Sequence, residues 1–328
     1  MTLQCLSLAA IVTLISSSLQ PALAQSAREF LPPELPWSGR SEELILDADA
    51  EWVTPAERSG LTTTPRYTET VAWLERLVAA APELSMMSIG QSAEGRHIWM
   101  VIASAEGAAS PAALKAGNKP TLLVQAGIHS GEIDGKDAGM MLLRDMTVLD
   151  TRADLLSKAN LLFIPILSVD GHERFSAYSR ANQRGPLMMG WRTNARNLNL
   201  NRDYTKLETE EIRAVVGVIE RWEPDLYLDL HVTDGADYQY DITWGYSRFD
   251  SWSPAITGWL NDSFTPAVTT TLEQWGHVPG PLVWPRNGTD LRQGNQMFSG
   301  SPRFSNQYGS ARHLPTVLVE NHSLKPYR

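Results

Sequence analysis

Apolar residues recur at helical spacing in the segment TTTPRYTETVAWLERLVAAAP, residues 62–82. The positions that share one face are Val71, Leu74, Leu77 and Val78. Intervals of three and four residues place such positions along one side of a helix. Thr64 stands directly before Pro65, and this pair is typical of a helix start. We therefore predict an amphipathic helix that begins at Thr64.

Short apolar runs predict strands along the rest of the chain. The runs LSMMSIG (84–90) and HIWMVIAS (97–104) are joined by the glycine-containing link QSAEGR, which predicts a hairpin. Longer apolar runs predict strands that are buried on both faces. They are PTLLVQAGIH (120–129), ANLLFIPIL (159–167), PDLYLDLH (224–231) and PTVLVENH (315–322).

Helical patterns lie between these strands. Residues 132–149 predict a helix with Ala138, Met141 and Leu142 as its apolar positions. Residues 207–222 are amphipathic, with acids in the first turn, where the helix dipole favours negative charge. The alternation predicts an α/β fold with a mixed, largely parallel central sheet flanked by helices. The chain stops eight residues after Glu320, where a covering helix is expected, and this suggests a fragment.

The N-terminus carries a short apolar run, CLSLAAIVTLISS, followed by a small-x-small pattern that ends at Ala24. This is typical of a secretory signal peptide over residues 1–24, although no Lys or Arg precedes the run. A single membrane anchor is the alternative. We expect a secreted or periplasmic protein with an extended lead-in over residues 25–60 and one folded domain over residues 61–328.

Composition narrows the classes of function. The chain has 328 residues, of which 43% are hydrophobic and 20% charged, and its formal net charge is −9. Without a basic stripe it does not resemble a general nucleic-acid binder. The only cysteine, Cys5, lies in the predicted signal peptide. Any metal site of the mature protein must therefore use histidines and carboxylates.

Four such residues stand at or near the ends of predicted strands. The stretch QAGIHSGEIDG, residues 125–135, places His129 and Glu132 three positions apart. His231 ends another strand, and Glu320 lies near the end of the last one. Ligands of open α/β sheets bind beyond the carboxyl ends of the strands, so we expect these side chains to converge. Two imidazoles and one carboxylate suit a catalytic zinc ion, whose fourth position is left for water.

The chain resembles the zinc carboxypeptidases of the M14, or carboxypeptidase A-like, family over roughly residues 60–328. The motifs that carry the resemblance occur in the family's order. They are HSGE, SVDGHERF, WRTNAR, NLNLNRDY, LDLH and LVENH. Each motif is weak alone, but several in order near strand ends are specific. The resemblance implies that residues 61–328 form a peptidase catalytic domain, and the early end of the chain suggests a truncation at its C-terminus.

The resemblance also implies a role for each matching residue. His129, Glu132 and His231 would hold one Zn²⁺ per chain. Glu320 would be the general base that takes a proton from water and passes it to the leaving amine. Arg192 would stabilise the oxyanion that develops on the scissile carbonyl.

Further residues match the family's substrate-binding positions. Asn201 and Arg202 would grip the terminal carboxylate of a peptide, which would make the enzyme an exopeptidase. The family's mobile tyrosine has its best counterpart in Tyr308, with Phe298 and Phe304 at other alignments. Family members carry an Asp where this chain has Asn199, so we expect weaker orientation of a zinc-bound histidine.

Competing interpretations remain for several residues. Asp234 lies three positions after His231 and is either an alternative ligand or a solvated turn residue. Arg196 competes with Arg192 for the carbonyl-polarising role. Arg303, in the segment expected to govern specificity, either favours acidic side chains or is an ordinary surface charge.

Three functions follow from this sequence. The leading one is a zinc metallocarboxypeptidase acting on peptides with a free C-terminal carboxylate, with no nucleic-acid partner and no membrane contact after signal cleavage. The second is a zinc amidase acting on cell-wall γ-D-glutamyl peptides or N-acyl amino acids. The third is a non-catalytic binding module that retains the fold. Manganese or iron could bind similar ligands, but the donor set favours zinc.

Overall fold

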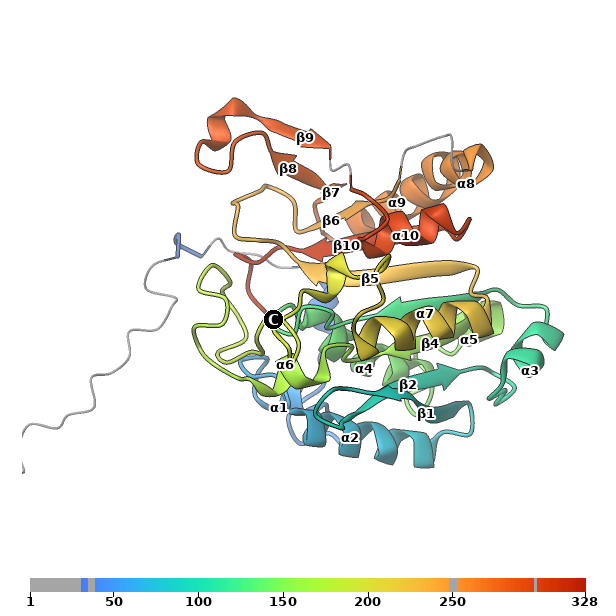
Figure 1. The fold of residues 1–328 in the computed structure, drawn as a ribbon. Helices are drawn as coiled ribbons and strands as arrows, with labels where there is room; N and C mark the ends of the chain where they lie inside the picture. The colour runs from blue at the N-terminus through green and yellow to red at the C-terminus, as the bar shows by residue number, and fades with distance from the viewer. Residues whose placement is uncertain (1–30, 35–38, 248–252, 298–299) are drawn as a thin grey trace, which may run out of the picture.

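The computed structural model describes residues 31–34, 39–247, 253–297 and 300–328 (Figure 1). Its centre is an eight-stranded sheet with the order β1-β2-β4-β3-β5-β10-β6-β7. The strands of this sheet are β1 (Leu84–Gln91), β2 (His97–Ala103), β3 (Thr121–Gln125), β4 (Asn160–Ile164), β5 (Leu226–Val232), β6 (Ile242–Gly245), β7 (Pro279–Pro281) and β10 (Thr316–Asn321). A separate ribbon pairs β8 (Val283–Pro285) with β9 (Asn295–Met297). The predicted signal peptide lies outside the described residues, so export stays a prediction.

The middle of the sheet is parallel. Strands β4, β3, β5 and β10 run side by side in one direction. On one side of these four strands, β2 of the β1–β2 hairpin pairs antiparallel with β4. On the other side, β6 pairs antiparallel with β10. The predicted hairpin and the mixed, largely parallel sheet are therefore confirmed. The carboxyl ends of β3, β5 and β10 come together at one edge.

Helices cover both faces of the sheet. The larger ones are α2 (Tyr67–Ala80), α4 (Asp134–Met146), α7 (Glu210–Trp222) and α9 (Thr265–Gln274). The shorter ones are α1 (Pro55–Arg58), α3 (Pro111–Ala116), α5 (Asp154–Lys158), α6 (Val169–Glu173), α8 (Pro254–Trp259) and α10 (Ser305–Ala311). Single turns are η2 (Arg40–Leu44), η3 (Leu200–Arg202), η4 (Leu260–Phe264) and η5 (Leu291–Gln293). Side chains of α7 form one core with the sheet, whereas α2 and α4 form a second core on its other face (Figure 1).

Two helices differ from their predictions. Helix α2 begins at Tyr67 because Glu69 accepts a hydrogen bond from the Arg66 amide at 2.9 Å and caps it there. The Thr64 hydroxyl donates instead to Asp137 of α4 at 2.7 Å. In α4 the predicted apolar positions Ala138 and Leu142 are exposed. The face of α4 that is buried carries Met140, Leu143, Lys136 and Arg144.

Part of the predicted extended lead-in is folded onto the domain. The Arg144 side chain is fully buried, and its Nη1 lies 2.9 and 2.7 Å from the two carboxylate oxygens of Glu57 in α1. Its Nη2 donates to the Leu44 carbonyl at 3.1 Å. The prediction of an extended lead-in is therefore wrong for residues 40–58, because a buried cation of the domain is neutralised from this segment.

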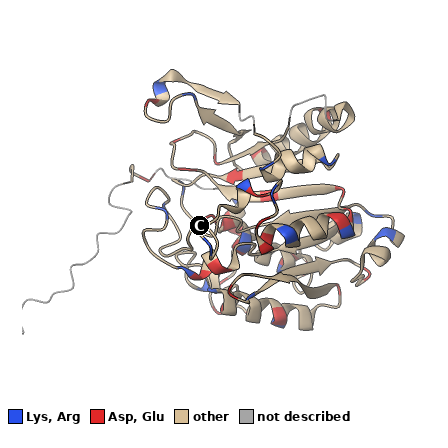
Figure 2. Cartoon of the chain, viewed as in Figure 1, with Lys and Arg blue, Asp and Glu red and all other residues tan. Residues whose placement is uncertain are grey.

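Basic and acidic residues occur together on the outer helices, as along α7 (Figure 2). Among the described residues, no helix combines the length and apolar character needed to cross a membrane.

Candidate metal centre and active site

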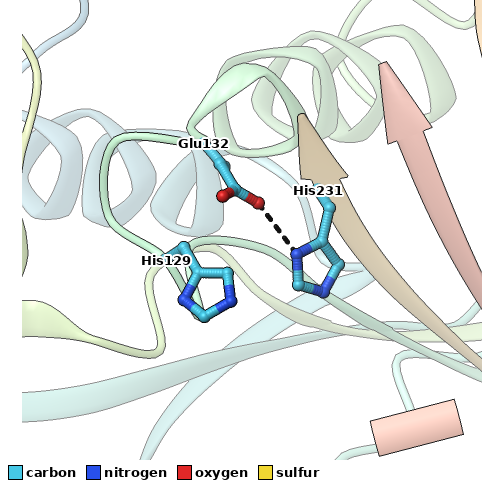
Figure 3. A group of neighbouring side chains, drawn as sticks. All are labelled: His129, Glu132 and His231. Carbon is cyan, nitrogen blue, oxygen red and sulfur yellow. Dashed lines mark hydrogen bonds and ion pairs between the residues drawn. The ribbon is translucent and has the colours of Figure 1, made fainter. Parts of the chain in front are cut away.

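His129, Glu132 and His231 meet at the carboxyl edge of the sheet (Figure 3). His129 and Glu132 lie in the loop between β3 and α4, and His231 lies in β5, the strand beside β3. One ligand atom from each residue lies within 4.8 Å of the other two. The side chains are buried, with only 2%, 3% and 5% of their residues' surfaces exposed. The predicted convergence of these residues is therefore present in the fold.

A tight turn brings the first two together. The Glu132 amide donates to the His129 carbonyl at 2.8 Å. Gly127 has a φ of +66°, a conformation that side chains disfavour. At Gly131 a Cβ atom would lie 2.6 Å from the side chain of Arg180, so only glycine fits. The strand β3 itself ends at Gln125, four residues earlier than predicted.

Asp229 orients His231. The two residues are two positions apart in β5 and therefore point to the same face. The Nε2 atom of His231 lies 2.8 Å from Asp229, and its Nδ1 atom lies 2.8 Å from Glu132. Burial alone lowers the pKa of His231, but the carboxylates of Asp229 and Glu132 outweigh it and raise that pKa well above its usual value. With Nε2–H donated to Asp229, Nδ1 is the atom presented to a cation.

Two arginines hold the other oxygen of Glu132. Arg180 Nη1 and Arg192 Nη1 lie 2.6 and 2.7 Å from Oε1. Burial acts to raise the pKa of Glu132, but the Arg180 guanidinium and the hydrogen bond with His231 outweigh it and hold the pKa well below its usual value. Glu132 is therefore an anionic ligand over the whole neutral range.

The residues present fit a zinc ion. Nδ1 of His129 is buried without a hydrogen-bond partner among the described residues, which is costly unless another group engages it. Burial lowers the pKa of His129 well below its usual value and keeps the imidazole neutral, the form that binds metals. Asn199, which matches the family's orienting Asp, has a buried Oδ1 without a partner. The orienting carboxylate observed here is Asp229 instead.

Glu320 lies beside this cluster. It is paired in register with His231 across the parallel strands β10 and β5. Its Oε2 atom is buried without a hydrogen-bond partner among the described residues. Burial raises the pKa of Glu320 to about 8, with Glu132 and Asp234 also raising it and His231 opposing them.

Basic and polar side chains complete the cavity that contains these groups. Arg192, Asn201 and Arg202 line it. The Arg202 guanidinium stacks 4.0 Å above the Phe304 ring and has no carboxylate partner among the described residues. Burial lowers the pKa of Arg202 to about 10, with Arg192 and Arg303 contributing. Arg202 is therefore still a cation at neutral pH and is available to an anionic ligand.

Asn201 lies in the site but is already engaged. Its Oδ1 accepts from the Ser305 amide at 2.8 Å, and its Nδ2 lies 3.3 Å from Nε2 of His231. Asp234 is largely exposed and contacts Arg180 and Arg192 at 3.4 and 3.8 Å rather than joining the cluster. Asp234 therefore lines the cavity mouth, and Asn201 supports its wall.

Other predicted residues lie elsewhere. Tyr308 packs against the ring of Tyr204, with centroids 5.4 Å apart, on the core side of α10. Tyr308 does not line the cavity, whereas Phe304 at the start of α10 does, and a substrate contact by Tyr308 stays a prediction. Phe298 lies outside the described residues. Arg196 forms an ion pair with Glu210 on the surface, away from the cavity.

Two residues of the site, Asp229 and Arg180, were not predicted from the sequence. Asp229 could have been found from its position two residues before His231, on the same strand face. Arg180 carries no such signal, because it lies in an irregular loop 48 residues after Glu132. Only the folded chain brings it to the cluster.

Solved structures share this fold. A metallo-carboxypeptidase from Burkholderia cenocepacia aligns with 17% identity and a TM-score of 0.57, over 79% of this chain and 60% of that one. One from Pseudomonas aeruginosa, in complex with (2-guanidinoethylmercapto)succinic acid, aligns with 17% identity and a TM-score of 0.55, over 78% and 60%. Carboxypeptidase A from Helicoverpa armigera aligns with 18% identity and a TM-score of 0.53, over 80% and 65%. The chain thus spans about three fifths of the length of the bacterial structures.

The family comparison is more specific. A search of curated proteins finds no matching sequence. The sequence model of the M14 peptidases, described as zinc carboxypeptidase, matches residues 70–288. The matched range contains the three clustered residues, and Glu320 lies beyond it. Zn²⁺ is the cofactor of this family, and the His129, Glu132 and His231 cluster is consistent with a zinc site. The chain therefore belongs to the zinc carboxypeptidase family of M14 peptidases.

Proposed function

We propose that this chain is a zinc-dependent metallocarboxypeptidase that hydrolyses the last peptide bond of substrates with a free C-terminal carboxylate. The proposal depends on one observation. A single cavity contains the His129, Glu132 and His231 donors, the buried carboxyl of Glu320 and the cation of Arg202, which has no carboxylate partner among the described residues.

His129, Glu132 and His231 would hold the zinc ion. A bound Zn²⁺ supplies a Lewis acid and lowers the pKa of water toward neutrality. Asp229 keeps the proton of His231 on Nε2, 2.8 Å away, so that Nδ1 stays free to act as a donor.

Glu320 would act as the general base. Its Oε2, which has no hydrogen-bond partner among the described residues, can accept a proton from the attacking water and later deliver it to the leaving amine. A carboxyl whose pKa is raised to about 8 exchanges its proton near neutral pH at little cost, which suits it to both steps.

Arg192 would stabilise the carbonyl oxygen as it gains negative charge. Its side chain is one-third exposed and lies at the cavity, so its guanidinium can reorient toward a bound substrate. One such donor typically contributes about two to three powers of ten in rate.

Arg202 would recognise the terminal carboxylate. A planar guanidinium can donate two parallel hydrogen bonds to a carboxylate, which fixes both distance and orientation. The Phe304 ring beneath it and the Asn201 carbonyl, 2.6 Å from Nη1, hold the guanidinium in place. We assign the carboxylate contact to Arg202 and a supporting role to the side chain of Asn201.

A neighbouring cavity would accept the side chain next to the scissile bond. Its volume is about 530 Å³, and it shares Glu320, Asp234, Leu282 and Trp284 with the site. Asp234 and Glu320 are its only charged lining residues among those described, whereas Arg303 is exposed and lies outside it. Apolar terminal residues would be preferred, and acidic ones would be disfavoured by charge.

The test combines metal analysis with C-terminal residue release. Purified protein is assayed on N-acyl dipeptides ending in Phe, Leu or Glu, on their C-terminal amides and on a γ-D-glutamyl peptide. We expect one zinc per chain, release of Phe or Leu from the free acids, and loss of activity with a chelator that zinc reverses. Turnover of the γ-D-glutamyl peptide alone would indicate a cell-wall amidase. Zinc binding without any turnover would indicate a binding module.

A further inference from the structure

Two arginines contact the same carboxylate oxygen but differ in how deeply their side chains are buried. Both Arg180 and Arg192 reach Oε1 of Glu132, at 2.6 and 2.7 Å. The side chain of Arg192 is 32% exposed, and its only other carboxylate partner is Asp234 at 3.8 Å among the described residues. The side chain of Arg180 is 5% exposed. Arg192 can therefore leave Glu132, whereas Arg180 is enclosed with it.

The remaining donors of Arg180 are bound to the segment that follows His231. Its Nη2 donates to the carbonyl oxygens of Val232 and Thr233 at 3.1 and 2.9 Å. A guanidinium is planar, so these bonds and the bond to Glu132 together define its position. Arg180 thereby links one candidate ligand, Glu132, to the strand end that carries another, His231.

Arg180 also supports the turn that joins His129 to Glu132. Its Nε donates to Gln183 Oε1 at 2.6 Å, and Gln183 Nε2 donates to the Gly131 carbonyl at 2.9 Å. The stem of Arg180 packs so close to Gly131 that a Cβ there would lie 2.6 Å from its Cδ. The space occupied by Arg180 is therefore the reason for a glycine inside the HSGE turn.

We propose that Arg180 is a positioning residue for the metal centre: its bond to Oε1 fixes the orientation of the Glu132 carboxylate, and its bonds to the segment after His231 set the spacing between the two segments that carry candidate ligands. This rests on the proposed function, in which Glu132 binds zinc. Arg180 touches neither substrate nor reacting atoms in this role. Lysine cannot replace it, because a single ammonium group cannot satisfy Glu132, Gln183 and two carbonyl oxygens in one plane.

The experiment measures zinc affinity rather than turnover. Dissociation constants are determined by competition with a chromophoric chelator for the wild-type chain, Arg180→Lys, Arg180→Gln and the matched control Arg192→Gln. Loss of a partner that orients a metal ligand typically costs about 10- to 100-fold in metal affinity, so we expect that loss in both Arg180 variants. The zinc dissociation constant of Arg192→Gln should stay within about threefold of the wild-type value, because partly exposed ion pairs contribute little. Its turnover should nevertheless fall.

A spectroscopic readout separates positioning from general destabilisation. Cobalt(II) is bound in place of zinc and its visible absorption recorded. In Arg180→Gln the Glu132 carboxylate loses the buried partner that fixes its orientation, so the visible bands of bound cobalt(II) should shift or weaken relative to those of the wild type. Arg180→Lys retains the charge and the alkyl stem, so it provides the measurement if Arg180→Gln does not fold.

The outcomes are distinct. Zinc affinity and cobalt spectra in folded Arg180→Lys that equal those of the wild type would overturn the positioning role alone. An equal loss of affinity in Arg180→Gln and Arg192→Gln, with no loss in Arg180→Lys, would show that the positive charge near Oε1, rather than the geometry of the Arg180 side chain, determines zinc affinity. A wild-type chain that binds no zinc would overturn the proposed metal centre together with this inference.

Discussion

Glu320 and His231 are direct partners in register across the parallel strands β10 and β5. Opposite residues of neighbouring strands point to the same face and are separated by about 5 Å. The candidate base and a candidate metal ligand are thus positioned relative to each other by backbone pairing rather than by a flexible loop.

Because Glu320 lies beside the candidate ligands without being one of them, we expect Glu320→Gln to impair catalysis without weakening zinc binding. The amide keeps the shape of the side chain but cannot accept the proton of water, so kcat should fall by about two to four powers of ten. Zinc affinity, measured by chelator competition, should change little, because Glu320 is not among the clustered donors. A variant that retained wild-type kcat would exclude Glu320 as the base.

Arg202→Lys should impair recognition of the chain end. The ammonium group retains the charge but loses the bidentate contact, so kcat/KM for a free-acid dipeptide should fall about 10- to 100-fold. For the corresponding C-terminal amide, which offers no carboxylate, wild type and variant should differ little. If both substrates were affected equally in steady-state assays, Arg202 would have a structural role instead.

Glu57→Gln should destabilise the domain. It removes one of the two carboxylates beside the fully buried Arg144: Glu57 lies 2.7 Å away, and Asp145, which remains, lies 2.8 Å away. Losing one charged hydrogen-bond partner while the other stays costs about 1.5–3 kcal/mol of unfolding free energy. The exposed pair of Arg40 and Glu43 provides the control, because Glu43→Gln should change stability by less than about 0.5 kcal/mol. Denaturant unfolding measures both. Equal stabilities would mean that the segment around α1 is not part of the cooperative unit.

His172 should make stability depend on pH. Burial lowers its pKa to about 4, although the neighbouring Glu173 acts to raise it. Between the ordinary pKa of 6.5 and about 4, the unfolded chain binds a proton that the folded chain does not. This contribution is therefore complete above pH 6.5 and is lost as the pH falls toward 4.

His172→Phe removes the titrating group while keeping a ring against Phe175, whose centroid lies 5.3 Å away. The loss of unfolding free energy between pH 6.5 and pH 5 should be smaller in the variant by on the order of 1–2 kcal/mol. Glu173, whose pKa is lowered to about 2, loses its contribution only below its ordinary value of 4.5 and does not interfere in this window. Parallel pH profiles would contradict the prediction.

The strands and the ligand candidates could be predicted because their signals are local. A short unbroken apolar run such as that of β3 is typical of a strand buried on both faces of a sheet. A polar residue at its end, such as His129, then lies where the carboxyl ends of the parallel strands meet. The positions of His231 and Glu320 followed from the same reasoning. Helix α4 was predicted, but its buried face was not, because Lys136 and Arg144 are buried by polar partners from distant segments.

By itself, the sequence determined the α/β architecture and which donors could serve a metal, since both depend on residue type and on neighbours along the chain. Only the tertiary structure decided that Arg180 holds those donors, that Tyr308 packs against the core and that residues 40–58 cover Arg144. The physical reason is that desolvated charges and hydrogen bonds between remote segments depend on where each side chain comes to lie. No local pattern encodes that position.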